Sequence, residues 1–103
     1  MRTITSTVVP VLVERVLLEV GSRVALARKA RELTQADLAQ LADVGVSTVA
    51  SLEAGYHGVS LGNFLKVLKG LDLLEQADGW LAPALDPAMV RFATKKLGGR
   101  RGE

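Results

Sequence analysis

The chain has 103 residues, of which 49% are hydrophobic, so it is long enough for one compact domain with a short extension at either end. The absence of cysteine excludes a disulfide framework, a thiolate nucleophile and a cysteine-based zinc site, which fits a cytoplasmic protein. The net charge of +2 is too small to indicate a nucleic-acid partner by itself, so the distribution of the charges matters more than their total.

Residues 1–20 are rich in threonine and valine. The stretch TITSTVV has the β-branched composition of a strand, and the apolar run VVPVLVERVLLEV after it can be helical from about Val11. Pro10, Glu14 and Arg15 interrupt this run, which is shorter than the ~20 residues that a membrane-spanning helix needs. We expect an N-terminal extension with no membrane contact, whose excess of apolar residues forms an interface with a second copy or with a partner.

Residues 21–82 have apolar positions at helical spacing, and this pattern predicts five helices. The first runs from Ser22 to Leu33, and Thr34 caps the second. The third starts at about Val46, Ser60 opens the fourth, and the fifth ends before Pro83. The apolar positions that define these helices are Val24, Leu26, Ala27, Ala30, Leu38, Leu41, Ala42, Val49, Leu52, Leu61, Phe64, Leu65, Leu68, Leu71, Leu74, Ala77, Trp80 and Leu81.

Four polar or small residues mark helix ends within this segment. Thr34 and Asp37 have the T-x-x-D spacing of a capping box, in which each side chain satisfies a free backbone N–H group. Asp43 stands where the chain needs a left-handed backbone, and Gly55 can end the third helix in the same conformation.

The stretch LTQADLAQLADVGVSTVASLEAG therefore contains two short helices joined by a tight turn. Ala39 is small enough for their close approach, and the angle between them is filled by Leu38, Val44, Val49 and Leu52. This arrangement is typical of a helix-turn-helix that reads DNA. The stretch holds three acids and no base, whereas bases precede it, follow it and dominate the tail: Arg23, Arg28, Lys29, Arg31, Lys66, Lys69, Arg91, Lys95, Lys96, Arg100 and Arg101.

The motifs LTQADLAQLA and STVASLEAG resemble those of the Xre-type (phage-repressor-like) helix-turn-helix family, and the resemblance covers about Gly21 to Ala82. The continuation GVSLGNFLKVLKGLDLL is similar to a narrower branch, the HipB-like antitoxins, which pair with HipA-type kinase toxins. The resemblance implies an all-α fold, with a compact five-helix, lambda-repressor-like domain over residues 21–82. An N-terminal extension over residues 1–20 and a basic tail over residues 83–103 complete the expected organisation.

The resemblance also assigns roles to residues. Gln35 would contact the DNA backbone, and Arg28 would form a structural ion pair with Glu53. The exposed face of the third helix would read base edges, and its residues are Val46, Ser47, Thr48 and Ser51. Gly45, just before this helix, would also bind DNA. None of these can make the two hydrogen bonds of an arginine, glutamine or asparagine reader, so we expect modest specificity, supplemented by dimerisation and DNA shape. Backbone N–H groups and helix N-termini can supply phosphate contacts beside the flanking bases.

Three features of the sequence each allow two interpretations. His57, the only histidine, contacts phosphate or lies inert in solvent. Trp80 packs in the core or a subunit interface, or it anchors a partner. The basic tail from Arg91 to Arg101 tracks DNA or an acidic partner, or it is a flexible end.

The function expected from this pattern is a sequence-specific transcriptional repressor that binds a palindromic operator as a homodimer. We further expect it to be the autoregulating antitoxin of a type II toxin–antitoxin operon with a HipA-like kinase toxin. The alternative is a protein-interaction module, toxin-neutralising or adaptor, with weak or non-specific DNA binding. No nucleophile, base and orienting group converge in the sequence, so neither catalysis nor a cofactor or metal is expected.

Overall fold

The computed structural model describes residues 8–101, with side chains through residue 96. The described residues are entirely helical outside turns and loops, which confirms the all-α prediction. The strand-like stretch at residues 3–9 lies mostly outside them. The elements are α2 (Val11–Ala30), α3 (Gln35–Ala42), α4 (Val46–Glu53), α5 (Leu61–Gly70), the 3₁₀ helices η1 (Leu74–Gly79) and η2 (Pro83–Leu85), and α6 (Pro87–Arg101).

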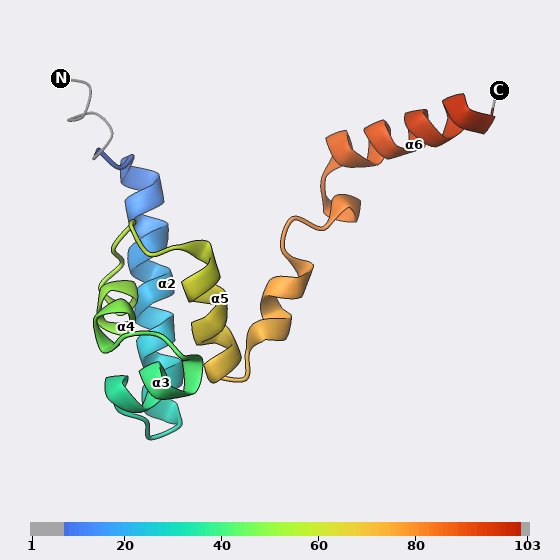
Figure 1. Ribbon diagram of the computed structural model, residues 1–103. Helices are drawn as coiled ribbons and strands as arrows, with labels where there is room; N and C mark the ends of the chain where they lie inside the picture. Colours follow the sequence, from blue (N-terminus) through green and yellow to red (C-terminus); the bar gives the residue numbers. More distant parts are fainter. Residues whose placement is uncertain (1–7, 102–103) are drawn as a thin grey trace.

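Helix α2 is the longest element, and it runs without a break through the boundary that we expected between residues 20 and 21. Pro10 precedes it and its carbonyl oxygen accepts a hydrogen bond from Glu14 N at 2.9 Å. Figure 1 shows α3, α4 and α5 packed along the C-terminal part of α2, while its N-terminal part projects beyond them. In that projecting part Val11 is 77% exposed and Leu12 66% exposed.

The buried core comes from α2 to α5 and the residue that follows α5. Leu38, Val49, Val67 and Leu71 have almost no exposed surface, and Leu71 directly follows α5. The remaining buried hydrophobic residues are Val24, Ala39, Ala42, Leu52 and Leu68. Ala39 therefore lies at the close contact that the helix-turn-helix spacing predicts.

The helix ends follow the local sequence signals. Thr34 Oγ1 accepts from Asp37 N at 3.0 Å and Asp37 Oδ2 accepts from Thr34 N at 2.9 Å, so the predicted capping box is confirmed. Asp43 has φ = 58° and Gly55 has φ = 81°, which confirms both predicted left-handed positions. Ser60 Oγ accepts from Asn63 N at 3.0 Å and so caps α5.

Several of the apolar residues that define the predicted helices are exposed. Leu41 is 60% exposed, because α3 turns Leu38, Ala39 and Ala42 toward the core and leaves Leu41 at the edge of that face. Leu61 was expected to point inward but is 65% exposed, since it opens α5 before the helix reaches the core. Leu26, which also helped to define the first predicted helix, is 68% exposed.

The C-terminal third leaves the bundle. The predicted fifth helix is the 3₁₀ helix η1, and Trp80 and Leu81 lie beyond its end. After η2, helix α6 points away from α2 to α5, as Figure 1 shows. The molecule is consequently elongated, with extents of 57 × 41 × 20 Å. Among residues 8–101 there is no helix with the length and apolar character needed to cross a bilayer.

Candidate nucleic-acid interface

Helix α4 presents one polar face to solvent. Val49 and Leu52 are one helical turn apart and bury the opposite face. Val46 is 48% exposed, Ser47 is exposed, and Thr48 and Ser51 are half-buried. No side chain caps the N-terminus of α4 at Gly45, so the backbone N–H groups of its first turn are not satisfied by a cap.

A shallow hollow of about 250 Å³ lies beside this face, and we call it the polar hollow. Its lining contains hydroxyl, amide and small groups and no Asp, Glu, Lys, Arg or His: Ser47, Thr48, Ser51, Tyr56, Gly58, Val59, Ser60 and Asn63. The structure thus unites three of the predicted reading residues with the loop after α4 and the first turn of α5. Tyr56, Ser60 and Asn63 were not predicted at this site, although the S-x-x-N spacing marks the start of a helix.

Two helix N-termini meet at the polar hollow. The first turn of α4 contributes Ser47 and Thr48, and the first turn of α5 contributes Ser60 and Asn63. Helix N-termini carry a partial positive charge and point backbone N–H groups outward, which makes them anion-binding positions. The N-terminus of α4, which has no side-chain cap, is therefore suited to phosphate without a charged side chain, whereas Ser60 Oγ already accepts from Asn63 N at the N-terminus of α5.

Gly58 lies in the loop between α4 and α5, next to the ring of Tyr56. A Cβ atom on Gly58 would collide with the ring of Tyr56, which lines the polar hollow. Tyr56 N donates to Ser51 O at 3.0 Å, so the loop is fixed to the end of α4. The tyrosine ring therefore forms one wall of the hollow.

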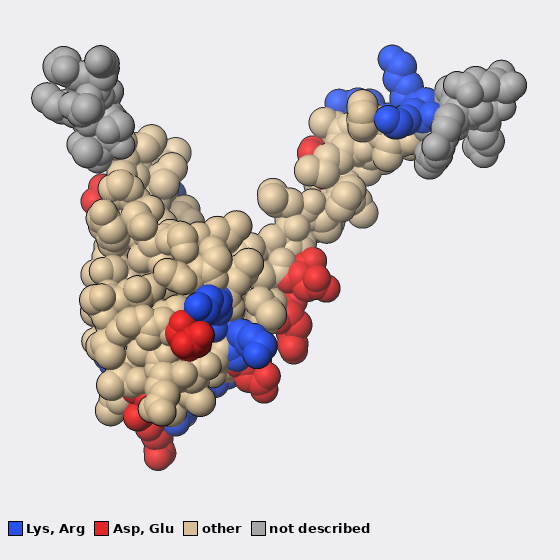
Figure 2. Space-filling model, in the orientation of Figure 1, with Lys and Arg blue, Asp and Glu red and all other residues tan. Residues whose placement is uncertain are grey.

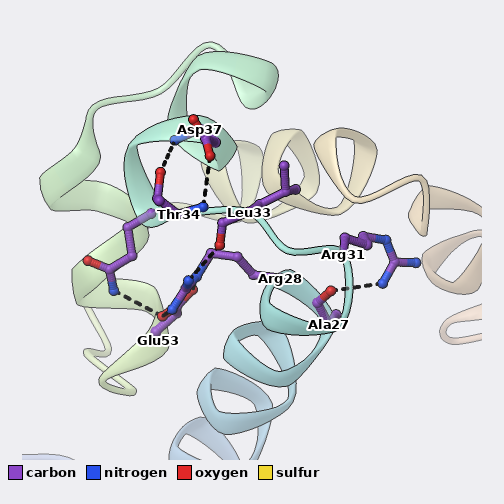
Figure 3. A network of polar contacts seen from close by, with 8 residues as sticks. Ala27, Arg28, Arg31, Leu33, Thr34, Asp37 and Glu53 are labelled. Carbon is purple, nitrogen blue, oxygen red and sulfur yellow. Dashed lines mark hydrogen bonds and ion pairs between the residues drawn. The ribbon is translucent and has the colours of Figure 1, made fainter.

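Arg28, Gln35 and Glu53 form a polar network that joins α2, α3 and α4 (Figure 3). Arg28 Nε lies 2.6 Å from Glu53 Oε2, and Arg28 Nη2 lies 3.0 Å from Glu53 Oε1. Gln35 Nε2 donates to Glu53 Oε1 at 2.9 Å, and Arg28 Nη1 donates to Leu33 O at 2.9 Å. The side chains of the ion pair are only 11% and 7% exposed, so the network fixes the helix-turn-helix on α2.

A family model described as helix-turn-helix matches residues 24–75, which is half of the chain. The match runs from the middle of α2 through α3, α4 and α5 into η1. The chain belongs to the Xre-like helix-turn-helix family. It is a DNA-binding transcription regulator. No curated protein and no solved structure matches the chain.

The network gives Gln35 a structural role in this helix-turn-helix protein. Its amide nitrogen is engaged by Glu53, and its side chain is half-buried. The contact of Gln35 with the DNA backbone stays a prediction, but its structural role within the domain was not anticipated. That role depends on Glu53, which lies 18 residues later in the sequence.

The network also sets the ionisation of Glu53. Burial raises the pKa of Glu53, but hydrogen bonds from Arg28 and Gln35 and the charges of Arg28 and Lys29 lower it. The net result is a pKa below that of an ordinary glutamate. At neutral pH the helix-turn-helix regulator therefore keeps this pair charged and hydrogen-bonded.

Three of the flanking bases near the bundle make contacts within the chain. Arg28 is committed to Glu53, and Arg23 lies 3.1 Å from Glu19 in an exposed pair. Arg31 donates to the carbonyl oxygen of Ala27 at 2.9 Å. Lys66 is exposed and lies one helical turn after Asn63, which places it on the same side of α5 as the polar hollow.

His57 lies elsewhere. Its ring is 5.0 Å from that of Tyr56, and it lines a separate apolar hollow of about 560 Å³ between α2 and α5. The structure does not bring His57 into the polar hollow with Ser47, Thr48 and Ser51. Among the described residues, no group of three or more His, Cys, Asp or Glu side chains is placed to hold a metal ion.

Proposed function

We propose that this regulator is a sequence-specific repressor that lays α4 into the major groove and turns the polar hollow toward the phosphates. The observation that supports this proposal is that the outward face of α4, which is uncharged, shares one surface with the N-termini of α4 and α5. Phosphate contacts position a protein on DNA, and base-edge contacts specify the sequence. In this proposal, the groups that contact phosphate lie next to the groups that contact base edges.

The base readers we propose are Val46, Ser47, Thr48 and Asn63. Val46 suits a thymine methyl group, and the two hydroxyl groups can bond to several bases. Asn63 carries an amide, which can make two hydrogen bonds to an adenine edge and contributes ~1–3 kcal/mol of discrimination when it does. Gly45, at the N-cap of α4, lets the backbone N–H groups of the first turn approach a phosphate.

We propose that the regulator acts as a homodimer on a palindromic operator. One such module reads few base pairs, and two-fold dimers read half-sites about one helical turn apart, ~34 Å. Residues 21–82 are proposed as the reading unit. The N-terminal part of α2 and the basic tail are proposed as contact regions outside it.

The narrower assignment, an autoregulating HipB-like antitoxin with a HipA-like kinase partner, is also a proposal. It is supported by the similar continuation GVSLGNFLKVLKGLDLL, which forms the end of the α4–α5 loop, helix α5 and the start of η1. A toxin would find an exposed apolar surface on the projecting part of α2, where Leu12 and Val16 are 66% and 57% exposed.

That same surface favours a second candidate function, a protein-interaction module with weak DNA binding. Arg28, Arg23 and Arg31 make contacts within the chain, so fewer bases near the bundle are free for phosphate. The two candidates differ in one observable, which is whether the protein alone selects a DNA sequence.

The test of the leading candidate is selection of duplexes from a random library at low and then at physiological salt. We expect a two-fold symmetric motif with half-sites about ten base pairs apart. Ser47→Glu should abolish binding to that motif by placing a charge against phosphate. The control Ser22→Glu adds the same charge on exposed α2, outside the polar hollow, and should bind as the unmodified protein does.

Recovery of only sequence-blind, salt-sensitive duplexes would support the interaction module instead. Binding by Ser47→Glu equal to that of the control would show that α4 is not the reading helix. Either outcome overturns the repressor proposal.

The toxin assignment has its own test, which is co-purification with a kinase encoded by a neighbouring gene. Leu12→Glu with Val16→Glu should release the kinase, because both side chains are exposed on the projecting part of α2. Leu26→Glu, at a 68% exposed position on the same helix, is the matched control and should retain it. Equal retention by the two variants would exclude this surface as the toxin contact.

A further inference from the structure

Helix α6 carries both apolar and basic side chains that are exposed, and the bundle of α2 to α5 does not cover it. It packs mainly on the short helix η2 and stands away from α2 to α5 (Figure 1). Met89, Val90 and Phe92 are 37%, 43% and 68% exposed. Residues 87–101 contain five bases and no acid, namely Arg91, Lys95, Lys96, Arg100 and Arg101.

The face of α5 and η1 has the opposite character. A hollow of about 670 Å³, which we call the acidic hollow, is lined by Leu61, Leu65, Leu74, Glu75, Ala77, Asp78 and Trp80. Trp80 is 49% exposed and stacks on Phe64 with 5.7 Å between the ring centroids. Residues 72–86 contain four acids, Asp72, Glu75, Asp78 and Asp86, and no base.

The two surfaces are therefore complementary in charge and alike in apolar content. Figure 2 shows acidic side chains along the segment that follows α5 and basic side chains on α6. Met89 and Phe92 lie one helical turn apart on α6, and Arg91 and Lys95 lie one turn apart beside them. The apolar side chains of α6, with bases beside them, therefore match the apolar lining of the acidic hollow, with acids beside it.

We propose that α6 of a second copy of this chain occupies the acidic hollow, with each copy's α6 in the hollow of the other. Phe92 and Met89 would pack on Trp80 and Leu61, while Arg91 and Lys95 would face Glu75 and Asp78. Because the basic helix and the acidic hollow belong to one chain, a two-fold axis satisfies both contacts at once and closes the assembly as a dimer.

The connection favours a second copy over the chain's own α6. One residue, Asp86, separates η2 from α6, and three residues separate η1 from η2. With α6 packed on η2 and directed away from the bundle, its basic face does not reach its own hollow. Exchange of a terminal helix between identical copies is a low-cost route to a dimer.

This proposal deepens the proposed function and rests on it only in supposing that the regulator works as a homodimer. Its test measures mass without DNA, so its failure is distinguishable from failure of DNA reading. The mass of one chain is 11.0 kDa, and light scattering behind size exclusion should give twice that value for the unmodified protein.

The decisive experiment uses two charge-reversed variants, each checked for helical content by circular dichroism. One carries Glu75→Lys and Asp78→Lys in the acidic hollow, and the other carries Arg91→Glu and Lys95→Glu on α6. Each variant alone opposes like charges and should be monomeric. An equimolar mixture pairs acidic helix with basic hollow and basic helix with acidic hollow, so it should restore the dimer.

Several outcomes would overturn the proposal. Variants that remain dimeric alone would place the interface elsewhere, for example on the projecting part of α2. A mixture that stays monomeric, or a monomeric unmodified protein, would mean that α6 does not join two copies. A dimeric Arg91→Glu/Lys95→Glu variant with weakened DNA binding would instead assign α6 to the DNA backbone.

An uncharged contact provides an independent check. Phe92→Asp should weaken dimerisation at least tenfold, because the ring is 68% exposed in one copy and would be covered in the pair. Leu26→Asp, which alters an equally exposed side chain on α2, should leave the dimer intact. Equal behaviour of these two variants would contradict the placement of α6.

Discussion

Gly21 is the residue on which the packing of α2 against α4 depends. A Cβ atom at this position would lie 2.5 Å from Leu52 O and 2.6 Å from Glu53 O. Both are backbone oxygens, so α4 itself would have to move. A glycine inside a helix costs roughly 0.5–1 kcal/mol relative to alanine, and close approach of the two helices is what offsets this cost.

Gly21→Ala should therefore lower the free energy of unfolding by about 2 kcal/mol, in the range of overpacked cores, despite the better helix propensity of alanine. The matched control is Gly62→Ala in α5, where a Cβ would meet nothing within 4 Å. The control should raise stability by roughly 0.4–1 kcal/mol. Urea denaturation measures both, and a stabilising Gly21→Ala would contradict the close contact.

The Arg28–Glu53 pair predicts a pH dependence of stability. The pKa of Glu53 in the folded protein lies below the ordinary glutamate value. The ionised carboxylate therefore contributes its full share to the free energy of unfolding at a pH above the ordinary value, and this share is lost as the pH falls through the lowered folded-state pKa. Arg28→Met should cost about 3 kcal/mol at pH 7, because it leaves a largely buried carboxylate without its charged partner.

When the pH is lowered, Arg28→Met should lose less additional stability than the unmodified protein does, because the pKa of Glu53 rises when Arg28 is removed. Adding Glu53→Leu to Arg28→Met should recover most of the loss, because no buried charge then remains. Thermal unfolding between pH 3 and pH 7 measures both effects. An unchanged acid profile in Arg28→Met would show that the pair does not control it.

At the scale of elements, α3 and α4 are too short to be stable alone. Each has 8 residues, whereas isolated helices need about 12–15 residues to be even marginal in water. Their helical state therefore depends on Leu38, Val49 and Leu52 in the core and on their end contacts.

The capping box of α3 makes this dependence measurable. Thr34→Ala should destabilise the protein by about 1 kcal/mol, because it removes the acceptor for Asp37 N. Asp37→Ala removes the reciprocal bond, and the double variant should cost less than the two single losses combined, since the pair acts as a unit. Thr94→Ala, at an exposed position on α6, should stay within about 0.5 kcal/mol of the unmodified protein.

At the scale of the whole molecule, the placement of charge determines how salt affects DNA binding. Lys66 is exposed and lies on the same side of α5 as the polar hollow. Lys66→Gln should weaken binding to all sequences alike and reduce the slope of log affinity against log salt by about 1.

The control for this prediction is Arg15→Gln, which removes one exposed base from the projecting part of α2. Titration of a fluorescent duplex at four salt concentrations measures both slopes. An equal fall in the two variants would mean that the effect comes from net charge rather than from a contact near the hollow.

The bounds of α2 differ from the prediction, but the sequence alone predicts the starts of α3, α4 and α5, the left-handed turn at Asp43, the burial of Ala39 and membership of the helix-turn-helix family. These features follow from interactions among residues within a few positions of one another, so spacing and side-chain chemistry suffice to predict them. Val67 shows the limit of that reasoning, because it is fully buried although the apolar pattern of α5 did not single it out.

Only the tertiary structure decided which distant groups share a surface. It joined Gln35 to Glu53 and brought Tyr56 and Asn63 beside Ser47, whereas His57 lines a neighbouring hollow. It also directed α6 away from the bundle. Each of these depends on how whole helices pack against one another, and helical periodicity states which face is apolar without stating what that face will meet.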